Sequence, residues 1–184
     1  MNPLKLRRLL ISIHLYVAGF MAPAILLMAM TGGLHLAGAS ETMTRTEIAL
    51  PANAELDFNS ETLEADIRTL LKDAGIDHRF EYVRGRGDMV QLRPTSRTFL
   101  ELAQTPDGLK ATRVQPNLMA GLMELHKGHG PRLYRLYGVL VGLALAIAVL
   151  GGILVGWLAP AYRRTTMIAT GLGLIPFILI GFIL

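Results

Sequence analysis

Three long apolar runs most limit what this chain can fold into. They cover about residues 9–36, 133–158 and 165–184, and each reaches the roughly 20 residues that an α-helix needs to cross a bilayer core. Three basic residues precede the first run, as in a signal peptide, but the apolar part of a signal spans only about 7–15 residues. We therefore expect an integral membrane protein with three transmembrane α-helices, the first of them uncleaved.

The distribution of charge predicts the topology. All 14 acidic residues and 12 of the 18 basic ones lie between Glu41 and Arg132, so the net charge of +4 comes from the flanks of the apolar runs. Basic residues in short flanks stay in the cytoplasm. The N-terminus and the Arg163-Arg164 turn are therefore expected inside, and the segment between the first two runs outside. The basic excess reflects this topology and gives no reason to expect nucleic-acid binding.

The segment between the first two runs predicts a small α+β domain at residues 60–116. Residues 37–59 are small and polar and are expected to form a linker. A helix should follow, capped by Asn59 or Ser60 and ended by Gly75. Its apolar stripe would be Leu63, Ile67, Leu70 and Leu71. Strand patterns at 80–83, 89–92, 98–102 and 111–114 complete the antiparallel sheet. The chain has no cysteine, so no disulfide holds this domain.

After Pro116 the chain is expected to become helical again. Asn117 can cap a short interfacial helix whose apolar side chains, among them Leu118 and Met123, would lie against the membrane surface. Pro131 suits the first turn of the second span. The full prediction is a cytoplasmic N-terminus at 1–8, transmembrane helices at 9–36, 131–159 and 165–184, a linker at 37–59, the α+β domain at 60–116, the interfacial helix at 117–130 and a cytoplasmic turn at 160–164.

Four histidines are the candidate functional residues, because they lie in or at the ends of apolar runs: His14, His35, His126 and His129. An ionisable side chain inside a membrane is by default a functional-site hypothesis. His14 and His35 are separated by about 31 Å along one helix, so they cannot ligate the same metal. For His14 the expected partners are Met167, a second subunit or a backbone carbonyl. His78 has the character of a surface residue.

His35 and the pair His126 and His129 are expected at the same, outer membrane face. This pattern permits a b-type haem whose iron is held by His35 and either His126 or His129. Lys127, Arg132 and Arg135 follow closely enough in sequence to meet the haem propionates. Two alternatives stay open. The histidines can serve only as interfacial hydrogen-bonding groups, or they can form a direct metal site.

Two short motifs carry a family resemblance. The first is Leu10 to Leu36, with an intrahelical His14 and Thr31-Gly32-Gly33 near its end. The second is Leu125-His126-Lys127-Gly128, followed by a run with Gly138, Gly142, Gly151-Gly152 and Trp157. Together with the helix-plus-sheet between them, they resemble PepSY-associated transmembrane proteins. The resemblance implies a bacterial inner-membrane protein with a periplasmic PepSY-like domain inserted between helices 1 and 2. It matches His14 and His126 to the family's histidines on the first and second spans.

The resemblance also implies a function. Larger members include haem-containing inner-membrane reductases that pass electrons to ferric siderophores, but residues 136–184 of this chain contain no histidine. We therefore expect a small auxiliary electron-transfer subunit with haem b, associated with a ferric reductase or respiratory complex. The alternatives are a cofactor-free accessory or assembly subunit and a PepSY module that restrains a protease or senses a ligand. No catalytic residue is predicted. The expected partners are the lipid bilayer and a larger membrane complex or further copies of the chain.

Overall fold

The computed structural model describes residues 3–51 and 53–183. The chain divides into two compact units. One comprises Met1–Met21 with Val139–Leu184, and the other comprises Ala22–Gly138. Helices α1 (Pro3–Leu36) and α4 (Arg132–Leu158) contribute to both units. The second unit holds the sheet and the histidines at positions 35, 126 and 129.

Three helices are long and apolar enough to cross a membrane, as the sequence predicts. They are Leu15–Leu36 within α1, Arg132–Leu158 (α4), and Arg163–Ile183, which joins α5 (Arg163–Ile178) to the π-helical segment η1 (Leu179–Ile183). Helix α1 begins at Pro3, so the segment predicted as a separate N-terminus at 1–8 is mostly helical. The physical reason is that proline suits the first turn of a helix, and the leucines, Lys5 and arginines after it are good helix formers.

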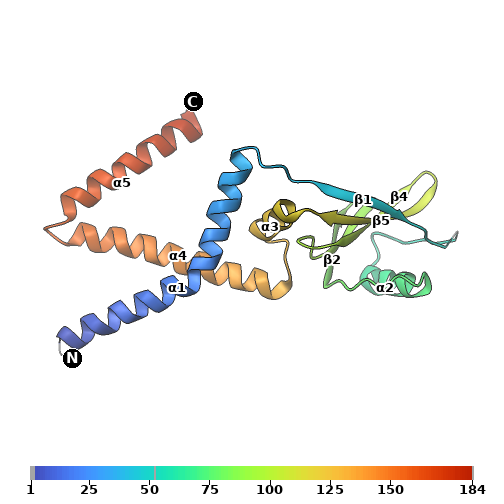
Figure 1. Ribbon diagram of the computed structural model, residues 1–184, viewed down its shortest axis with the longest axis horizontal. Coiled ribbons are helices and arrows are strands. Elements are labelled where there is room, and N and C mark those ends of the chain that lie inside the picture. The colour runs from blue at the N-terminus through green and yellow to red at the C-terminus, as the bar shows by residue number, and fades with distance from the viewer. Residues whose placement is uncertain (1–2, 52, 184) are drawn as a thin grey trace. The chain divides into compact units, whose positions relative to one another are not determined.

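The Ala22–Gly138 unit contains a five-stranded antiparallel sheet in the order β1-β5-β4-β3-β2 (Figure 1). The strands are β1 (Met43–Ile48), β2 (Tyr82–Arg86), β3 (Met89–Arg93), β4 (Phe99–Thr105) and β5 (Gly108–Pro116). Gly87 and Gly108 take positive φ angles of 62° and 110° in the β2–β3 and β4–β5 turns, which is why glycine stands there. This α+β arrangement confirms the helix-then-meander prediction.

Helix α2 (Leu63–Asp73) lies along one face of this sheet (Figure 1). Its Ile67 and Leu71 are buried against a core that includes Leu92, Leu100 and Leu102. Gly75 follows the helix with a φ of +66°, as predicted. Leu63 and Leu70 are both only partly buried. Leu63 packs against the core, because it shares the line through Ile67 and Leu71, whereas Leu70 lies beside that line.

Strand β1 corrects the predicted linker at 37–59. Met43–Ile48 pairs with β5 along its whole length, from Met43 opposite Pro116 to Ile48 opposite Ala111. Only its two end residues are partly buried. An edge strand exposed on both faces shows no alternation of apolar and polar residues, and this alternation is the signal that predicts strands. Backbone pairing with a partner far away in the sequence therefore creates an element that the local pattern does not reveal.

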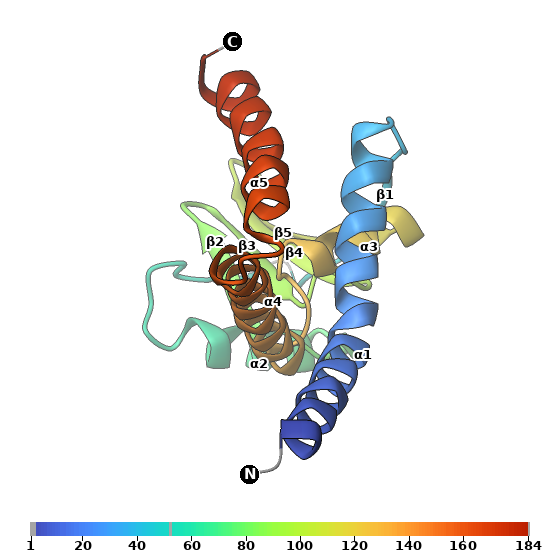
Figure 2. The same ribbon diagram turned by 90° about the vertical axis from the view of Figure 1, so that its left-hand side faces the viewer.

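Helix α3 (Leu118–His126) begins at the predicted cap, where the Asn117 side chain accepts a hydrogen bond from the amide of Ala120 at 2.8 Å. The helix is more deeply packed than an interfacial helix should be. Ala120 and Met123 are buried, and α3 contacts strand β5, although Leu118 remains exposed. Met123 therefore packs within the protein rather than against a membrane surface. In both views α3 lies beside the C-terminal half of α1 (Figure 1 and Figure 2).

Candidate functional site

Two helices that carry candidate histidines end in the same way. After α1, Gly38 takes a φ of +86°, and the amides of Gly38 and Ala39 donate to the carbonyls of His35 and Leu34. After α3, Gly128 takes a φ of +77°, and the amides of Gly128 and His129 donate to the carbonyls of Leu125 and Glu124. This pair of bonds is the Schellman motif. It turns the backbone sharply after each of the two helices, so that side chains after the turn can contact the last turn of the helix.

At the end of α1 the returning side chain is Glu41. Its Oε1 lies 2.6 Å from Nδ1 of His35, whose side chain is 60% exposed. The other oxygen of Glu41 lies 3.7 Å from Nζ of Lys127, just after α3. Lys127 also lies 3.5 Å from Oε1 of Glu124. A single lysine therefore bridges carboxylates from the segment after α1 and from α3.

At the end of α3 the returning side chain is His129. Its Nδ1 lies 2.8 Å from Oε2 of Glu124, and the hydroxyl of the buried Thr95 donates to the same oxygen. Burial acts to raise the pKa of Glu124. The hydrogen bonds from Thr95 and His129, with the positive charges of His129 and Lys127, outweigh burial and hold that pKa below its usual range. Glu124 is therefore an ionised carboxylate at neutral pH.

His126 points from α3 toward α1. Its Nδ1 lies 2.7 Å from Oγ1 of Thr31, and that hydroxyl lies 2.6 Å from the carbonyl oxygen of Leu27 one turn earlier. Thr31 is 1% exposed. Gly32 lies beside the ring, since a Cβ at that position would stand 3.5 Å from Cε1 of His126. The Thr31-Gly32 and Leu125-His126 motifs therefore meet in one contact.

Two sets of contacts lie at the end of α3, and we name their side chains together the histidine–carboxylate cluster. One set links His35, Glu41, Lys127, Glu124, Thr95 and His129 by ion pairs and hydrogen bonds. The other is the contact of His126, the residue before Lys127, with Thr31. The cluster contains three of the four predicted histidines. The sequence pointed to Thr31 only as part of a family motif, and sequence reasoning missed Glu41, Thr95 and Glu124. Glu124 carried a usable signal, since it is the only acidic residue in the mostly apolar α3, and an acid in that setting needs partners.

Other predicted residues lie elsewhere. Arg132 and Arg135, expected to meet haem propionates, instead stand over the ring of Tyr82, with guanidinium carbons 5.8 Å and 5.5 Å from its centre. The physical reason is that an aromatic face in strand β2 attracts cations at the start of α4. The Tyr82 hydroxyl also donates to the carbonyl of Gly130 at 3.2 Å. The side chain of His14 lies outside the described part of the chain.

The cluster has a clear donor pattern. In His35, His126 and His129 the Nδ1 atom is engaged by a side-chain oxygen, and no residue within 3–51 and 53–183 bonds their Nε2 atoms. Across the same residues, no three His, Asp or Glu side chains gather in a group that could hold a metal ion. The groups that the cluster offers to a ligand are therefore imidazole Nε2 atoms, and the contact at Nδ1 fixes the orientation of each ring.

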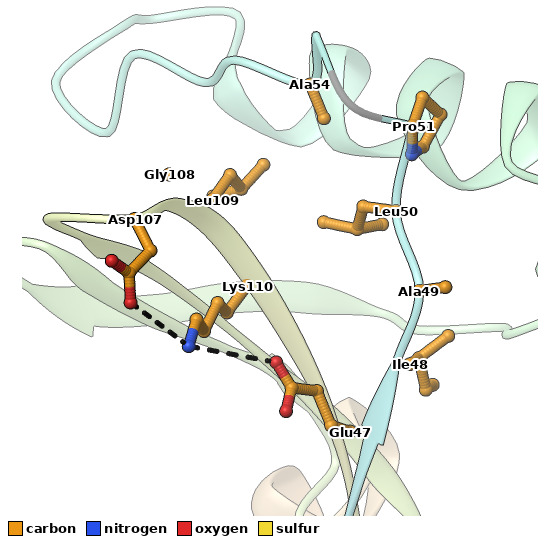
Figure 3. A pocket seen from close by; sticks show the side chains of 10 residues that line it. All are labelled: Glu47, Ile48, Ala49, Leu50, Pro51, Ala54, Asp107, Gly108, Leu109 and Lys110. Atoms are coloured by element: carbon orange, nitrogen blue, oxygen red, sulfur yellow. Dashed lines mark ion pairs between the residues drawn. The ribbon is translucent and has the colours of Figure 1, made fainter.

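A separate pocket of about 420 Å³ lies between the end of β1, the segment after it, and the β4–β5 turn (Figure 3). Lys110 in its wall lies 3.6 Å from Asp107 and 3.9 Å from Glu47. Lys110 thus pairs with both carboxylates, and the other lining residues are apolar apart from Gly108. The pocket offers no nucleophile or histidine. The cluster is therefore the stronger candidate site.

Comparison with protein-family models, curated proteins and solved structures finds no match to this chain. The resemblance to PepSY-associated proteins therefore rests on the short motifs around Thr31 and His126. Functional inference depends on the contacts of the histidine–carboxylate cluster. Those contacts join the C-terminal end of α1, the end of α3 and the segment that carries Thr95.

Proposed function

We propose that this chain is a PepSY-like protein of the bacterial inner membrane, with its N-terminus in the cytoplasm and its α+β domain in the periplasm. Three helices long enough to span a bilayer support the membrane location. The basic flanks Lys5, Arg7, Arg8 and Arg163-Arg164 support the orientation. A reporter that is active only outside the cytoplasm, fused after Leu50, should be active. Activity of a cytoplasm-specific reporter at this position would reverse the topology.

Its proposed role is that of an auxiliary electron-transfer subunit for a ferric reductase or respiratory complex. His35, with His126 or His129, would hold a b-type haem, which when bound supplies one-electron transfer. The observation that carries this proposal is that all three histidines have Nδ1 engaged and Nε2 free of described partners. Metal-ligating histidines characteristically bond their second ring nitrogen to a carboxylate or another oxygen. Lys127, already within the cluster, is a better propionate partner than Arg132 or Arg135, which stand over Tyr82.

One observation favours a second candidate, a cofactor-free accessory subunit. The cluster's carboxylates already have cationic or hydrogen-bonding partners, because Glu41 contacts His35 and Lys127, and Glu124 contacts Thr95, Lys127 and His129. Such a network can fasten α3 to the segment after α1 without any ligand. The same three histidines would then serve the packing of the protein and its docking to a larger complex.

An absorption spectrum separates the two candidates. The full chain, expressed with a haem precursor and purified in detergent, should show a reduced-minus-oxidised haem band. His35→Ala should remove the band, and His78→Ala should keep it, because His78 lies near α2 and outside the cluster. A wild-type protein without any haem band would rule out the electron-transfer role and leave the accessory subunit.

A further inference from the structure

The hydroxyl of Thr31 decides where the ring proton of His126 lies. Thr31 Oγ1 makes two short contacts, 2.6 Å to the carbonyl oxygen of Leu27 and 2.7 Å to Nδ1 of His126. A hydroxyl has one proton to donate and lone pairs to accept with, whereas a carbonyl oxygen can only accept. The Thr31 proton must therefore point to Leu27, in the back-bonding pattern common for threonine in helices.

Nδ1 of His126 must then carry its own hydrogen. If Nδ1 were bare, it would need the single Thr31 proton, and two oxygens would face one another at 2.6 Å with no hydrogen between them. The next carbonyl within reach, that of Met28 at 3.4 Å, is also only an acceptor. We propose that Thr31 fixes neutral His126 as the Nδ1–H tautomer, so that Nε2 presents its lone pair for a ligand.

The surroundings make Thr31 a positioning residue. It is 1% exposed, so solvent competes little for its hydroxyl. The imidazole lies beside Gly32, where the helix has no side chain, with Cε1 only 3.5 Å from the place that a Cβ would occupy. Ring orientation and tautomer are thus both set from α1. That Nε2 faces iron rests on the proposed function, whereas the tautomer itself does not.

Nitrogen NMR of the full chain tests the inference. The protein, labelled with ring-¹⁵N histidine and kept free of haem in detergent micelles, is measured in alkaline buffer, where free imidazole is neutral. His126 is assigned by the loss of its signals in His126→Gln. We expect a protonated Nδ1 and a bare Nε2. A wild-type His126 protonated on Nε2 would overturn the inference without any need for a variant.

Two substitutions make a matched pair. Thr31→Val keeps the shape of the side chain but removes the acceptor, so the proton should move largely to Nε2, while Thr31→Ser should preserve the wild-type spectrum. An unchanged tautomer in Thr31→Val would contradict the role of Thr31. Unaltered His78 signals in each variant show that the sheet domain is folded.

A haem titration keeps this inference separate from the proposed function. If haem binds, Thr31→Val should weaken it by about 10–100-fold, as loss of a group that orients a metal ligand typically does, and Thr31→Ser should weaken it far less. A bare Nε2 in a protein that never binds haem supports the role of Thr31 and overturns the haem assignment. If the protein binds haem but His126 in its haem-free form is protonated on Nε2, the haem assignment is supported and the role of Thr31 is overturned.

Discussion

The apolar core beneath α2 and the histidine–carboxylate cluster belong to the same Ala22–Gly138 unit but are built on different physics. The core packs Ile67 and Leu71 against leucines that are fully buried. The cluster joins segments as much as 95 residues apart by single polar contacts, such as Thr31 to His126. The exposed fraction of its members also varies, from 1% for Thr31 and Thr95 to 60% for the His35 side chain.

Because of this difference, substitutions in the two regions should lower the stability of the protein in different ways. A core residue contributes roughly in proportion to the apolar volume it buries, and truncation leaves a cavity. A polar cluster contributes little for each contact that forms, but removing one partner leaves another buried group unsatisfied. Substitutions that preserve shape should therefore spare the core and damage the cluster, whereas substitutions that preserve polarity should do the opposite.

The largest effect should come from the core. Ile67→Ala should lower the free energy of unfolding by about 2–5 kcal/mol, because it removes a fully buried side chain. Leu70→Ala on the same helix should cost clearly less, because Leu70 is only partly buried. Unfolding of the full chain in urea, with protease resistance of the sheet domain as the readout, measures the loss of stability in both variants. Equal losses would mean that the buried face of α2 is rotated toward Leu70.

The buried end of the cluster should come next. Glu124→Gln keeps the side chain's size but removes the charge that Thr95, Lys127 and His129 share, and should cost about 1–3 kcal/mol. Glu41→Gln is the matched control and should cost about 0–1 kcal/mol, since its partners His35 and Lys127 are largely solvated. Hydrogen exchange of the α3 amides reports both variants. A greater loss in Glu41→Gln would place the anchor of the cluster at the exposed end.

A smaller effect should follow loss of one neutral hydrogen bond between the sheet and the start of α4. Tyr82→Phe retains the ring beneath Arg132 and Arg135 but removes the bond to the Gly130 carbonyl, and should cost about 0.5–1.5 kcal/mol. Tyr162→Phe, at a tyrosine that is 67% exposed, should be near neutral. Thermal unfolding in detergent compares the two variants. No change in Tyr82→Phe would show that the Gly130 contact adds nothing to stability.

The sequence predicts the elements of this protein better than their contacts. The three apolar helices, the Asn117 cap and Gly75 at the end of α2 depend on local composition, and all three features are present. Strand β1 has no such local pattern, since its pairing partner lies more than 60 residues away. The His126 contact with Thr31 likewise joins two helices, and no spacing within either helix could reveal it.

The smallest effects should appear in the acid titration, which separates the two regions by pH. Burial, followed by the charges of Arg113 and Arg97, lowers the pKa of His78 beside α2, with Asp77 partly opposing them. The folded chain therefore binds fewer protons at His78 than the unfolded one, and stability falls as the pH drops below about 6.5. Glu124, whose pKa is also lowered, contributes stability that is lost only below about pH 4.3.

His78→Gln should flatten the first part of this profile and Glu124→Gln the second. Urea midpoints measured at intervals between neutral and acidic pH give both profiles. If the loss of stability below about pH 6.5 persists in His78→Gln, another group is responsible for it.

The pairing of β1 with β5 has a consequence for how this protein can be divided. Met43 stands opposite Pro116, so the residues where the chain enters and leaves the sheet are adjacent ladder partners, about 5 Å apart. Asn117 strengthens this junction, because its amide donates to the carbonyl of Thr42 and its side chain to that of Ser40. Domains whose ends lie together can be inserted into or removed from a host chain with little disturbance of either part. A short turn could therefore join Thr42 to Asn117 in place of the sheet, but it would remove Thr95 and Tyr82 and with them the hydrogen bonds to Glu124 and Gly130.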